Sequence, residues 1–168
     1  SFWLLYSPLQ EASSIRSDMV IPFSNHFLDR PKLLSEIKNN LKAAKGIQVV
    51  ALVGIGGTGK TTLARYYVQQ QKASFAWEIN AESHLSLTNS FEKMAYALCK
   101  TEEDLRFLKR LKDIENIEEK EDRILLFVKN KLKDFPSWIL FFDIVEAMTE
   151  IQQHIPLDTN TWGNGKVI

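Results

Sequence analysis

The sequence is poor in the residues that build disulfides and transition-metal sites, with one cysteine and three histidines among its 168 residues. The single thiol, Cys99, cannot form a disulfide within the chain, which favours a reducing, cytoplasmic compartment. It lies in an apolar helical pattern, so we expect a buried, inert thiol rather than a nucleophile. His26, His84 and His154 are widely spaced without ligand spacing around them, so the sequence predicts no transition-metal site.

Net charge and long apolar runs are also absent. Lysine plus arginine and aspartate plus glutamate number 21 each, so the formal net charge is zero. A neutral chain gives no electrostatic reason to expect nucleic acid or an anionic membrane as the main partner. No segment approaches the roughly 20 apolar residues that span a bilayer. The hydrophobic share of 45% is ordinary for a soluble globular protein.

Alternating apolar runs and helical patterns predict an α/β fold. Short β-branched or aromatic runs predict strands over residues 47–53, 75–80 and 137–143, with another opening at 167. Helical spacing of apolar residues predicts helices over residues 32–45, 60–72, 89–100, 121–133 and, more briefly, 147–153. We expect a parallel sheet with helices on both faces, because strands that alternate with helices require crossover connections.

The remaining stretches are expected to be irregular or short. Residues 101–121 are rich in charge and predict short helical pieces around a loop, and residues 156–165 predict a surface loop. The helix over residues 89–100 would be capped by Thr88 or Asn89. Residues 1–24 are expected to form an N-terminal arm or linker before a nucleotide-binding domain over residues 25–168.

A glycine-rich stretch directly after the strand predicted over residues 47–53 has the pattern G-x-x-x-x-G-K-[S/T] of a phosphate-binding loop. It consists of Gly54, Ile55, Gly56, Gly57, Thr58, Gly59, Lys60 and Thr61, and Thr62 follows. Glycines allow successive N–H groups to point at phosphate, and the following helix directs the positive end of its dipole there. Lys60 would reach the β- and γ-phosphates, and Thr61 would offer a hydroxyl to Mg²⁺. These residues predict the binding of a nucleoside triphosphate, ATP with Mg²⁺.

A second part of the same site is expected at Asp143. A charge appears here where the apolar strand 137–143 ends, which suits a carboxylate that holds the water shell of Mg²⁺. The alternative is an aspartate that caps the next turn. Hydrolysis also needs a group that orients or deprotonates water, and Ile144, which comes next, can do neither. Glu146 is the nearest candidate carboxylate, although a plain surface residue would need no role.

Several stretches together resemble the NB-ARC nucleotide-binding domain, a branch of the STAND class of P-loop signal-transduction ATPases. These stretches are residues 27–30, 50–64, 77–83, 138–146 and 162–163. The family includes apoptotic protease-activating factors, plant disease-resistance proteins and bacterial proteins with tetratricopeptide repeats. The resemblance implies a three-layer P-loop NTPase fold, which the chain would contain in C-terminally truncated form, because it stops where a strand begins.

The resemblance also implies a switch. Such proteins hold ADP in a closed state and exchange it for ATP to open and oligomerise, so protein partners or self-association are expected. The segment before the first helix contacts adenine in this family, which by position falls on Phe27, Leu28 and Arg30. Their alternative role is an apolar staple with a solvent-exposed arginine. The family usually has glycine where this chain has Asp29, and an acidic residue or asparagine where it has Ile144.

Three functions remain open from the sequence. The first is a nucleotide-switched signalling module with slow or no hydrolysis, at most a slow ATPase. The second is a kinase or other phosphoryl-transfer enzyme on a P-loop fold, although no arginine-rich lid is present. The third is a truncated scaffold fragment that binds little nucleotide.

Overall fold

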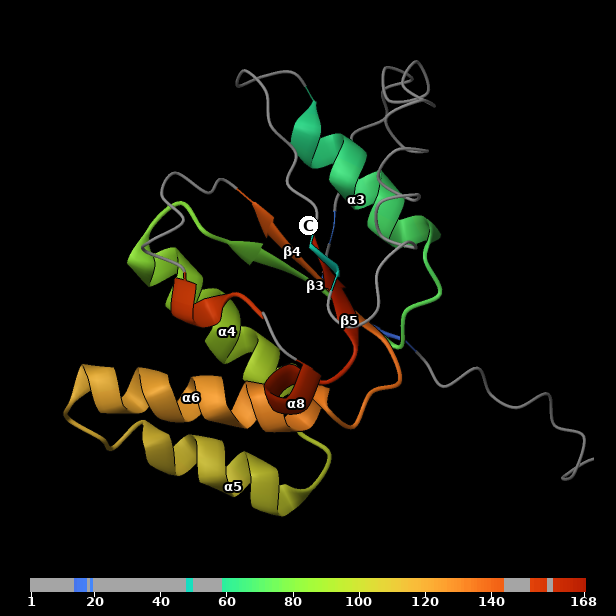
Figure 1. Ribbon diagram of the computed structural model, residues 1–168. Coiled ribbons are helices and arrows are strands. Elements are labelled where there is room, and N and C mark those ends of the chain that lie inside the picture. Colours follow the sequence, from blue (N-terminus) through green and yellow to red (C-terminus); the bar gives the residue numbers. More distant parts are fainter. Residues whose placement is uncertain (1–13, 18, 20–47, 50–58, 144–151, 157–158) are drawn as a thin grey trace, which may run out of the picture.

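The computed structural model describes residues 14–17, 19, 48–49, 59–143, 152–156 and 159–168. Figure 1 shows a parallel sheet between helical layers, which confirms the predicted α/β fold. The strands are β1 (Ile15–Arg16), β2 (Gln48–Val49), β3 (Phe75–Asn80), β4 (Trp138–Asp143) and β5 (Gly165–Val167). The helices are α3 (Lys60–Gln70), α4 (His84–Ala97), α5 (Glu102–Leu111), α6 (Ile117–Leu132) and α8 (Thr159–Trp162), with a 3-10 turn, η2 (Gln152–His154). None of these helices is long and apolar enough to cross a membrane.

The strand order places the ends of β3 and β4 side by side. The order across the sheet is β1-β3-β4-β5-β2, and every neighbouring pair is parallel. Asn80 is in register with Asp143, so both strands finish at one border of the sheet, here called the carboxyl edge. In open α/β sheets this edge is where ligands bind.

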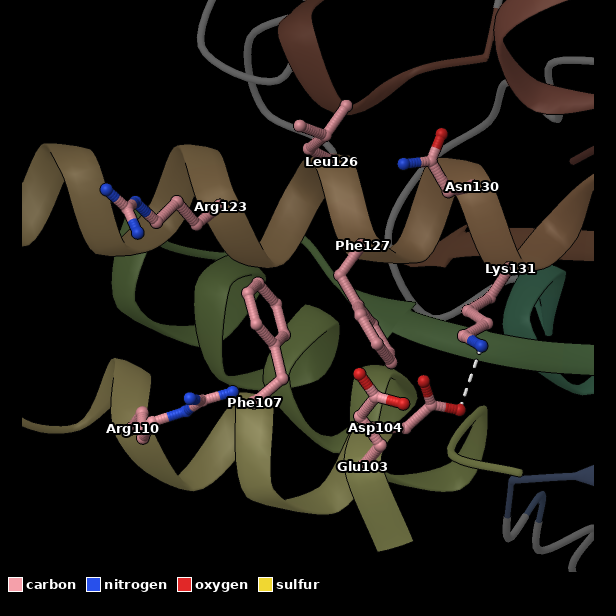
Figure 2. A pocket seen from close by; sticks show the side chains of 9 residues that line it. All are labelled: Glu103, Asp104, Phe107, Arg110, Arg123, Leu126, Phe127, Asn130 and Lys131. Carbon is pink, nitrogen blue, oxygen red and sulfur yellow. Dashed lines mark ion pairs between the residues drawn. The ribbon is translucent and has the colours of Figure 1, made fainter. Parts of the chain in front are cut away.

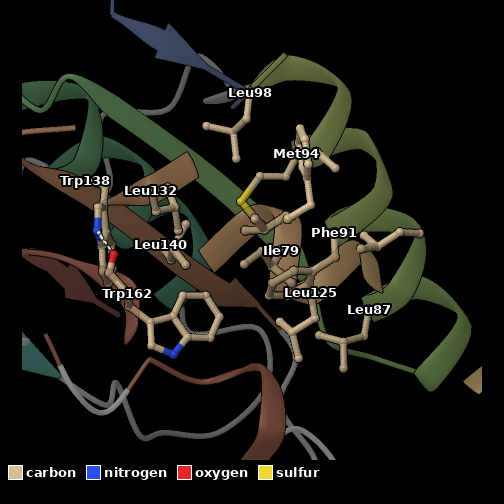
Figure 3. Packing of buried hydrophobic residues seen from close by; sticks show 14 of the residues in the cluster. Ile79, Leu87, Phe91, Met94, Leu98, Leu125, Leu132, Trp138, Leu140 and Trp162 are labelled. Carbon is tan, nitrogen blue, oxygen red and sulfur yellow. Dashed lines mark hydrogen bonds between the residues drawn. The ribbon is translucent and has the colours of Figure 1, made fainter. Parts of the chain in front are cut away.

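Side chains of β4 alternate between the two faces of the sheet, as the period of two in a strand requires. Trp138, Leu140 and Phe142 join a cluster with residues of α4, α5, α6 and α8, which defines the α4–α6 face (Figure 3). Ile139 and Phe141 join a second cluster with residues of α3, which defines the α3 face. Because both faces are covered, the strand is apolar throughout until it reaches the carboxyl edge.

Helix α3 packs as its sequence predicts. The residues expected to face inward are buried, namely Leu63, Ala64, Tyr67 and Val68. The apolar side predicted for the helix over residues 121–133 is also buried, and consists of Ile124, Leu125, Phe127, Val128 and Leu132. The stretch 101–121 contains α5 and the start of α6 around a short connection, which confirms the short helical pieces expected there.

The predicted start of α4 is wrong. The helix begins at His84 rather than at residue 89, and its cap is Ser83 instead of Thr88 or Asn89. The Ser83 hydroxyl accepts a hydrogen bond of 3.0 Å from the amide of Ser86. Leu87 precedes the predicted start, is 1% exposed and lies four residues before Phe91, so the inward-facing pattern extends into this turn although Leu85 is 69% exposed.

The predicted start of α6 is late by four residues. Asn116 caps the helix by accepting from the Glu119 amide at 3.1 Å, and Ile117 in the first turn is 70% exposed. An exposed first turn carries no inward-facing apolar residue from which its start could be inferred.

The surface loop predicted over residues 156–165 is also incorrect. Its residues 159–162 form α8, and Trp162 is buried against the α4–α6 face. The indole nitrogen of Trp138 donates to the carbonyl of Trp162 at 3.0 Å. Gly163, at φ +82°, ends the helix in the left-handed conformation that glycine tolerates. The last strand begins at Gly165, two residues earlier than predicted, where a Cβ would collide with Trp138.

Part of the N-terminal arm joins the sheet. Ile15 and Arg16 pair with the start of β3. The Arg16 guanidinium donates to the carbonyls of Val68 and Gln71 at 3.1 and 2.6 Å, at the end of α3. A cation here is favoured because helix C-termini carry unpaired carbonyls and partial negative charge. The segment therefore ties the sheet edge to α3.

Candidate functional site

Two residues predicted to hold Mg²⁺ lie in direct contact. The Thr61 hydroxyl, in the first turn of α3, donates to Oδ1 of Asp143 at 2.7 Å. They are 82 positions apart in sequence, and the contact is partly buried. Asp143 is the last residue of β4 and follows Ile139 and Phe141 on the α3 face, so the carboxylate emerges beside the start of α3. The fold thus brings together a hydroxyl oxygen and a carboxylate at the carboxyl edge.

Backbone hydrogen bonds fix this end of the sheet. The amide of Ala81 donates to the carbonyl of Asp143 at 2.8 Å, which joins the ends of β3 and β4. The Asn80 side chain accepts from the amide of Glu82 at 3.0 Å. Both strand ends are therefore held where Asp143 meets α3.

The beginning of α3 differs from those of α4, α5 and α6 on the other face. Its N-cap is Gly59, in the left-handed conformation at φ 80°, and no side chain caps it. In contrast, Ser83, Thr101 and Asn116 each accept a hydrogen bond from their own helix at the N-terminus of α4, α5 and α6. Free N–H groups at a helix start, together with the helix dipole, favour an anion. Helix α3 therefore begins beside Asp143 without a side-chain cap.

An ion pair on the α3 face lies next to these groups. Nε of Arg65 donates to both carboxylate oxygens of Glu78 at 3.1 and 3.0 Å, and Nη2 donates to Oε1 at 2.8 Å. The hydrogen bond to Glu78 raises the pKa of Arg65, burial opposes that rise, and the charges of Glu78 and Asp143 add to it. Sequence reasoning did not select this pair, although a lone carboxylate within the run 75–80 was a visible signal.

Other predicted site residues fall outside the described ranges. These are Phe27, Leu28 and Arg30, the loop residues Gly54, Ile55, Gly56, Gly57 and Thr58, and Glu146. The helix predicted over residues 147–153 is described only at its end, where η2 lies. Lys60 is placed as the first residue of α3, and Thr62 lies half-buried in the same turn.

A pocket of about 510 Å³ lies between α5 and α6 (Figure 2). Stacked rings of Phe107 and Phe127, with centroids 5.8 Å apart, form part of its lining. Lys131 and Asp104 pair at 2.8 Å at one end. All of its lining residues belong to these two helices, so it is separate from the place where Thr61 meets Asp143.

The remaining nucleophile and metal-ligand candidates give no second site among the described residues. Cys99 is half-buried, and its thiol donates to the carbonyl of Ala95 at 3.6 Å. Burial raises the pKa of Cys99, which disfavours the reactive thiolate. Across the described residues, His, Cys, Asp and Glu side chains form no group of three or more that could hold a metal ion.

Comparison with known proteins gives one match. A family model described as the NB-ARC domain matches residues 30–162, which is most of the chain. Neither the curated proteins nor the solved structures give a match. The matched range contains the loop 54–61, Thr61, Asp143 and the Arg65–Glu78 pair.

Proposed function

The chain belongs to the NB-ARC domain family of nucleotide-binding signalling modules, and on that premise we propose that it is a switch operated by ADP and ATP with Mg²⁺. The single observation that carries the proposal is the 2.7 Å contact between Thr61 and Asp143. The contact joins Thr61, the last residue of the phosphate-binding sequence, to the carboxylate at the end of β4. A nucleotide–Mg²⁺ site requires both parts.

The donor set fits Mg²⁺. This ion prefers oxygen ligands, keeps several of its waters and is usually held by one or two protein groups together with phosphate oxygens. Thr61 and Asp143 supply a hydroxyl and a carboxylate from two rigid elements, α3 and β4. When bound, the ion would neutralise charge on the phosphates.

The phosphates would lie against the start of α3. Gly59 leaves that helix without a side-chain cap, so its N–H groups are suited to phosphate oxygens. Lys60 would add a positive charge at the β- and γ-phosphates. The adenine would contact Phe27, Leu28 and Arg30, as the family resemblance implies.

Turnover of ATP is expected to be slow or absent. The residue after Asp143 is Ile144, whose side chain has no group to orient or deprotonate water. Slow hydrolysis suits a switch, because the bound nucleotide then reports the state of the protein. In the whole protein, that state would control contact with protein partners or self-association.

Magnesium linkage tests the proposal. We expect ADP to bind the unmodified chain more tightly in millimolar Mg²⁺ than in EDTA. In Asp143→Asn and Thr61→Val that advantage should fall by roughly tenfold, about 1.4 kcal/mol. Thr61→Ser keeps the hydroxyl and should keep the linkage. Asp134→Asn is the charge control, because it removes an exposed carboxylate that precedes the opposite end of β4. An unchanged linkage in Asp143→Asn would contradict the assignment of this carboxylate.

A single-turnover experiment with ATP tests the proposed slow hydrolysis. A preformed complex should release ADP and phosphate far below the ~10 s⁻¹ typical of enzymes. Glu146→Gln measures whether that carboxylate contributes to any residual rate. Turnover of about 1 s⁻¹ or faster would mean that the chain is an ATPase in its own right rather than a slow switch.

A further inference from the structure

Asn80 has the only side chain with an N–H group that β3 and β4 place on the α3 face. The side chains on that face follow the period of two in each strand and are Ala76, Glu78, Asn80, Ile139, Phe141 and Asp143. The carboxylates of Glu78 and Asp143 only accept hydrogen bonds, whereas an asparagine amide can also donate two. Asn80 therefore adds a neutral donor to a border of the sheet that otherwise carries acceptors.

Asn80 lies directly beside the proposed metal ligand Asp143. The two residues are in register at the ends of β3 and β4, which run side by side (Figure 1). Neighbouring strands are about 4.8 Å apart, and side chains in register point to the same face. Asn80 can therefore reach groups that are bound at Asp143 and Thr61 without displacing either residue.

Hydrogen bonds fix the direction of the Asn80 side chain. The backbone amide of Asn80 donates to the Ser90 hydroxyl of α4 at 3.1 Å, and Oδ1 of Asn80 accepts from the amide of Glu82 at 3.0 Å. Because the turn uses Oδ1, the open end of the side chain is its NH₂ group. Within the described part of the chain, neither this NH₂ group nor Oδ2 of Asp143 has a hydrogen-bond partner. A donor held in one direction loses little freedom when it binds.

The terminal phosphoryl group of a triphosphate fits such a donor. In P-loop sites the metal ion bridges oxygens of the β- and γ-phosphates, so the γ-phosphoryl group would lie by the ion that Thr61 and Asp143 hold. Its oxygens carry negative charge close to the carboxylate of Asp143, and a nearby donor would offset the repulsion. A neutral amide can do so without competing with Mg²⁺ for Asp143, as a cationic side chain would.

Resting on the function proposed above, we propose that Asn80 is a specificity-determining residue that donates a hydrogen bond to the γ-phosphoryl group and thereby distinguishes ATP from ADP. ADP lacks this group, so its affinity does not depend on the NH₂ group of Asn80. The end of β3 then takes part in reading the state of the switch, although no residue of β3 holds the ion.

Two variants isolate the NH₂ group. Asn80→Asp keeps an acceptor for the Glu82 amide and adds a negative charge, whereas Asn80→Ala removes the acceptor and adds no charge. The change that both share is the loss of the N–H donors. Because Asn80 is exposed, we expect both variants to fold, and their binding of ADP would show that they do.

The experiment measures the dissociation constants of ADP and of an ATP analogue with an imido bridge between its β- and γ-phosphorus atoms, both in millimolar Mg²⁺. In both variants the affinity for the analogue should fall roughly tenfold or more, the loss expected for one hydrogen bond to a charged group, while the affinity for ADP should stay nearly the same. Asn130→Asp is the matched control, because it makes the same chemical change at an exposed position of α6, on the other side of the sheet (Figure 2). It should leave both affinities unchanged.

The outcomes separate this inference from the proposed function. If the unmodified chain binds ADP with Mg²⁺ linkage but the variants lose neither nucleotide, or both equally, the role of Asn80 is refuted while the function stands. A selective loss in Asn80→Asp alone would be an effect of the added charge and would also refute it. If the unmodified chain binds neither ADP nor the analogue, both the function and the inference are overturned.

Discussion

The two faces of the sheet differ in the side chains that the same strand, β4, presents at its carboxyl end. On the α4–α6 face, Trp138, Leu140 and Phe142 continue an apolar surface to the end of β4 (Figure 3). On the α3 face, the apolar residues Ile139 and Phe141 give way to Asp143 at the carboxyl edge. One face of a strand can therefore provide stability over its whole length while the other changes to ligand chemistry within two residues.

The helix starts show the same division. In α4, α5 and α6 the N-cap side chain accepts a hydrogen bond from one amide of the first turn, and these caps are Ser83, Thr101 and Asn116. Helix α3 begins at Gly59 without such a cap. An N-cap side chain at that position would occupy the N–H groups that a phosphate needs. The comparison teaches that the α3 face gives up local stabilisation in favour of the proposed ligand.

The largest expected effect comes from emptying the α4–α6 face. Phe91 is 1% exposed, so Phe91→Ala should lower the free energy of unfolding by about 3–5 kcal/mol through lost burial and the cavity left behind. The nucleotide affinity of the molecules that remain folded should change little, since Phe91 is on the opposite face from Thr61. Denaturant unfolding and nucleotide titration below the melting temperature measure both. If Phe91→Ala lowered the free energy of unfolding by less than about 1 kcal/mol, the α4–α6 face would not be the main source of stability.

Lower pH should weaken the α4–α6 face through His154. This side chain is buried with its ring edge-on to Phe91, and Nδ1 has no hydrogen-bond partner among the described residues. Burial lowers the pKa of His154 most, and the positive charges of His84 and Lys129 lower it further, against nearby carboxylates of Glu121 and Asp122. The unfolded chain therefore binds the proton more readily than the folded one.

The free energy of unfolding should therefore decrease as the pH falls. The stability that neutral His154 contributes is complete above the unfolded pKa of about 6.5, and it is lost as the pH falls below that value. The free energy of unfolding should fall with a slope of at most about 1.4 kcal/mol per pH unit for this group. His154→Leu should reduce the slope between pH 7 and 5. An equal slope in His154→Leu would assign the pH dependence to other groups.

The smallest effect concerns the cap that distinguishes α4 from α3. Ser83→Ala removes the acceptor for the Ser86 amide and should cost about 1 kcal/mol of stability without changing nucleotide affinity. Thr88→Ala, which removes a hydroxyl from inside the same helix, serves as the control. Thermal melting measures the difference. A Ser83→Ala variant as stable as Thr88→Ala would remove the contrast between the capped helices and α3.

The strands with buried side chains could be predicted from the sequence. The strand 75–80 was predicted with its observed bounds, and the strand 137–143 with an error of one residue, because apolar runs covered on both faces have a clear signal. Asp143 was predicted to hold Mg²⁺, as was Thr61, because a charge ends one such run, and the two side chains are in contact. Buried pattern and loop chemistry were thus enough to select two side chains, Thr61 and Asp143, that the fold brings together.

Features that depend on single long-range contacts could not be predicted. The Arg65–Glu78 pair joins residues 13 positions apart, and Arg16 reaches the end of α3 from 52 positions away. Neither contact leaves a periodic trace in the sequence. Helix α8 was missed because four residues with one buried tryptophan, Trp162, are too short to show helical spacing.

The central claim, that this chain binds a nucleotide through the phosphate loop and Asp143, is tested most directly by calorimetric titration of ADP and ATP with Mg²⁺ into the unmodified chain and Lys60→Ala. We predict saturable binding to the unmodified chain. Lys60→Ala should lose about 1.5–3 kcal/mol of affinity, the usual worth of a hydrogen bond to a charged group, while its melting temperature without nucleotide stays the same. Equal affinity in Lys60→Ala, or no binding by the unmodified chain up to millimolar nucleotide, would contradict the claim.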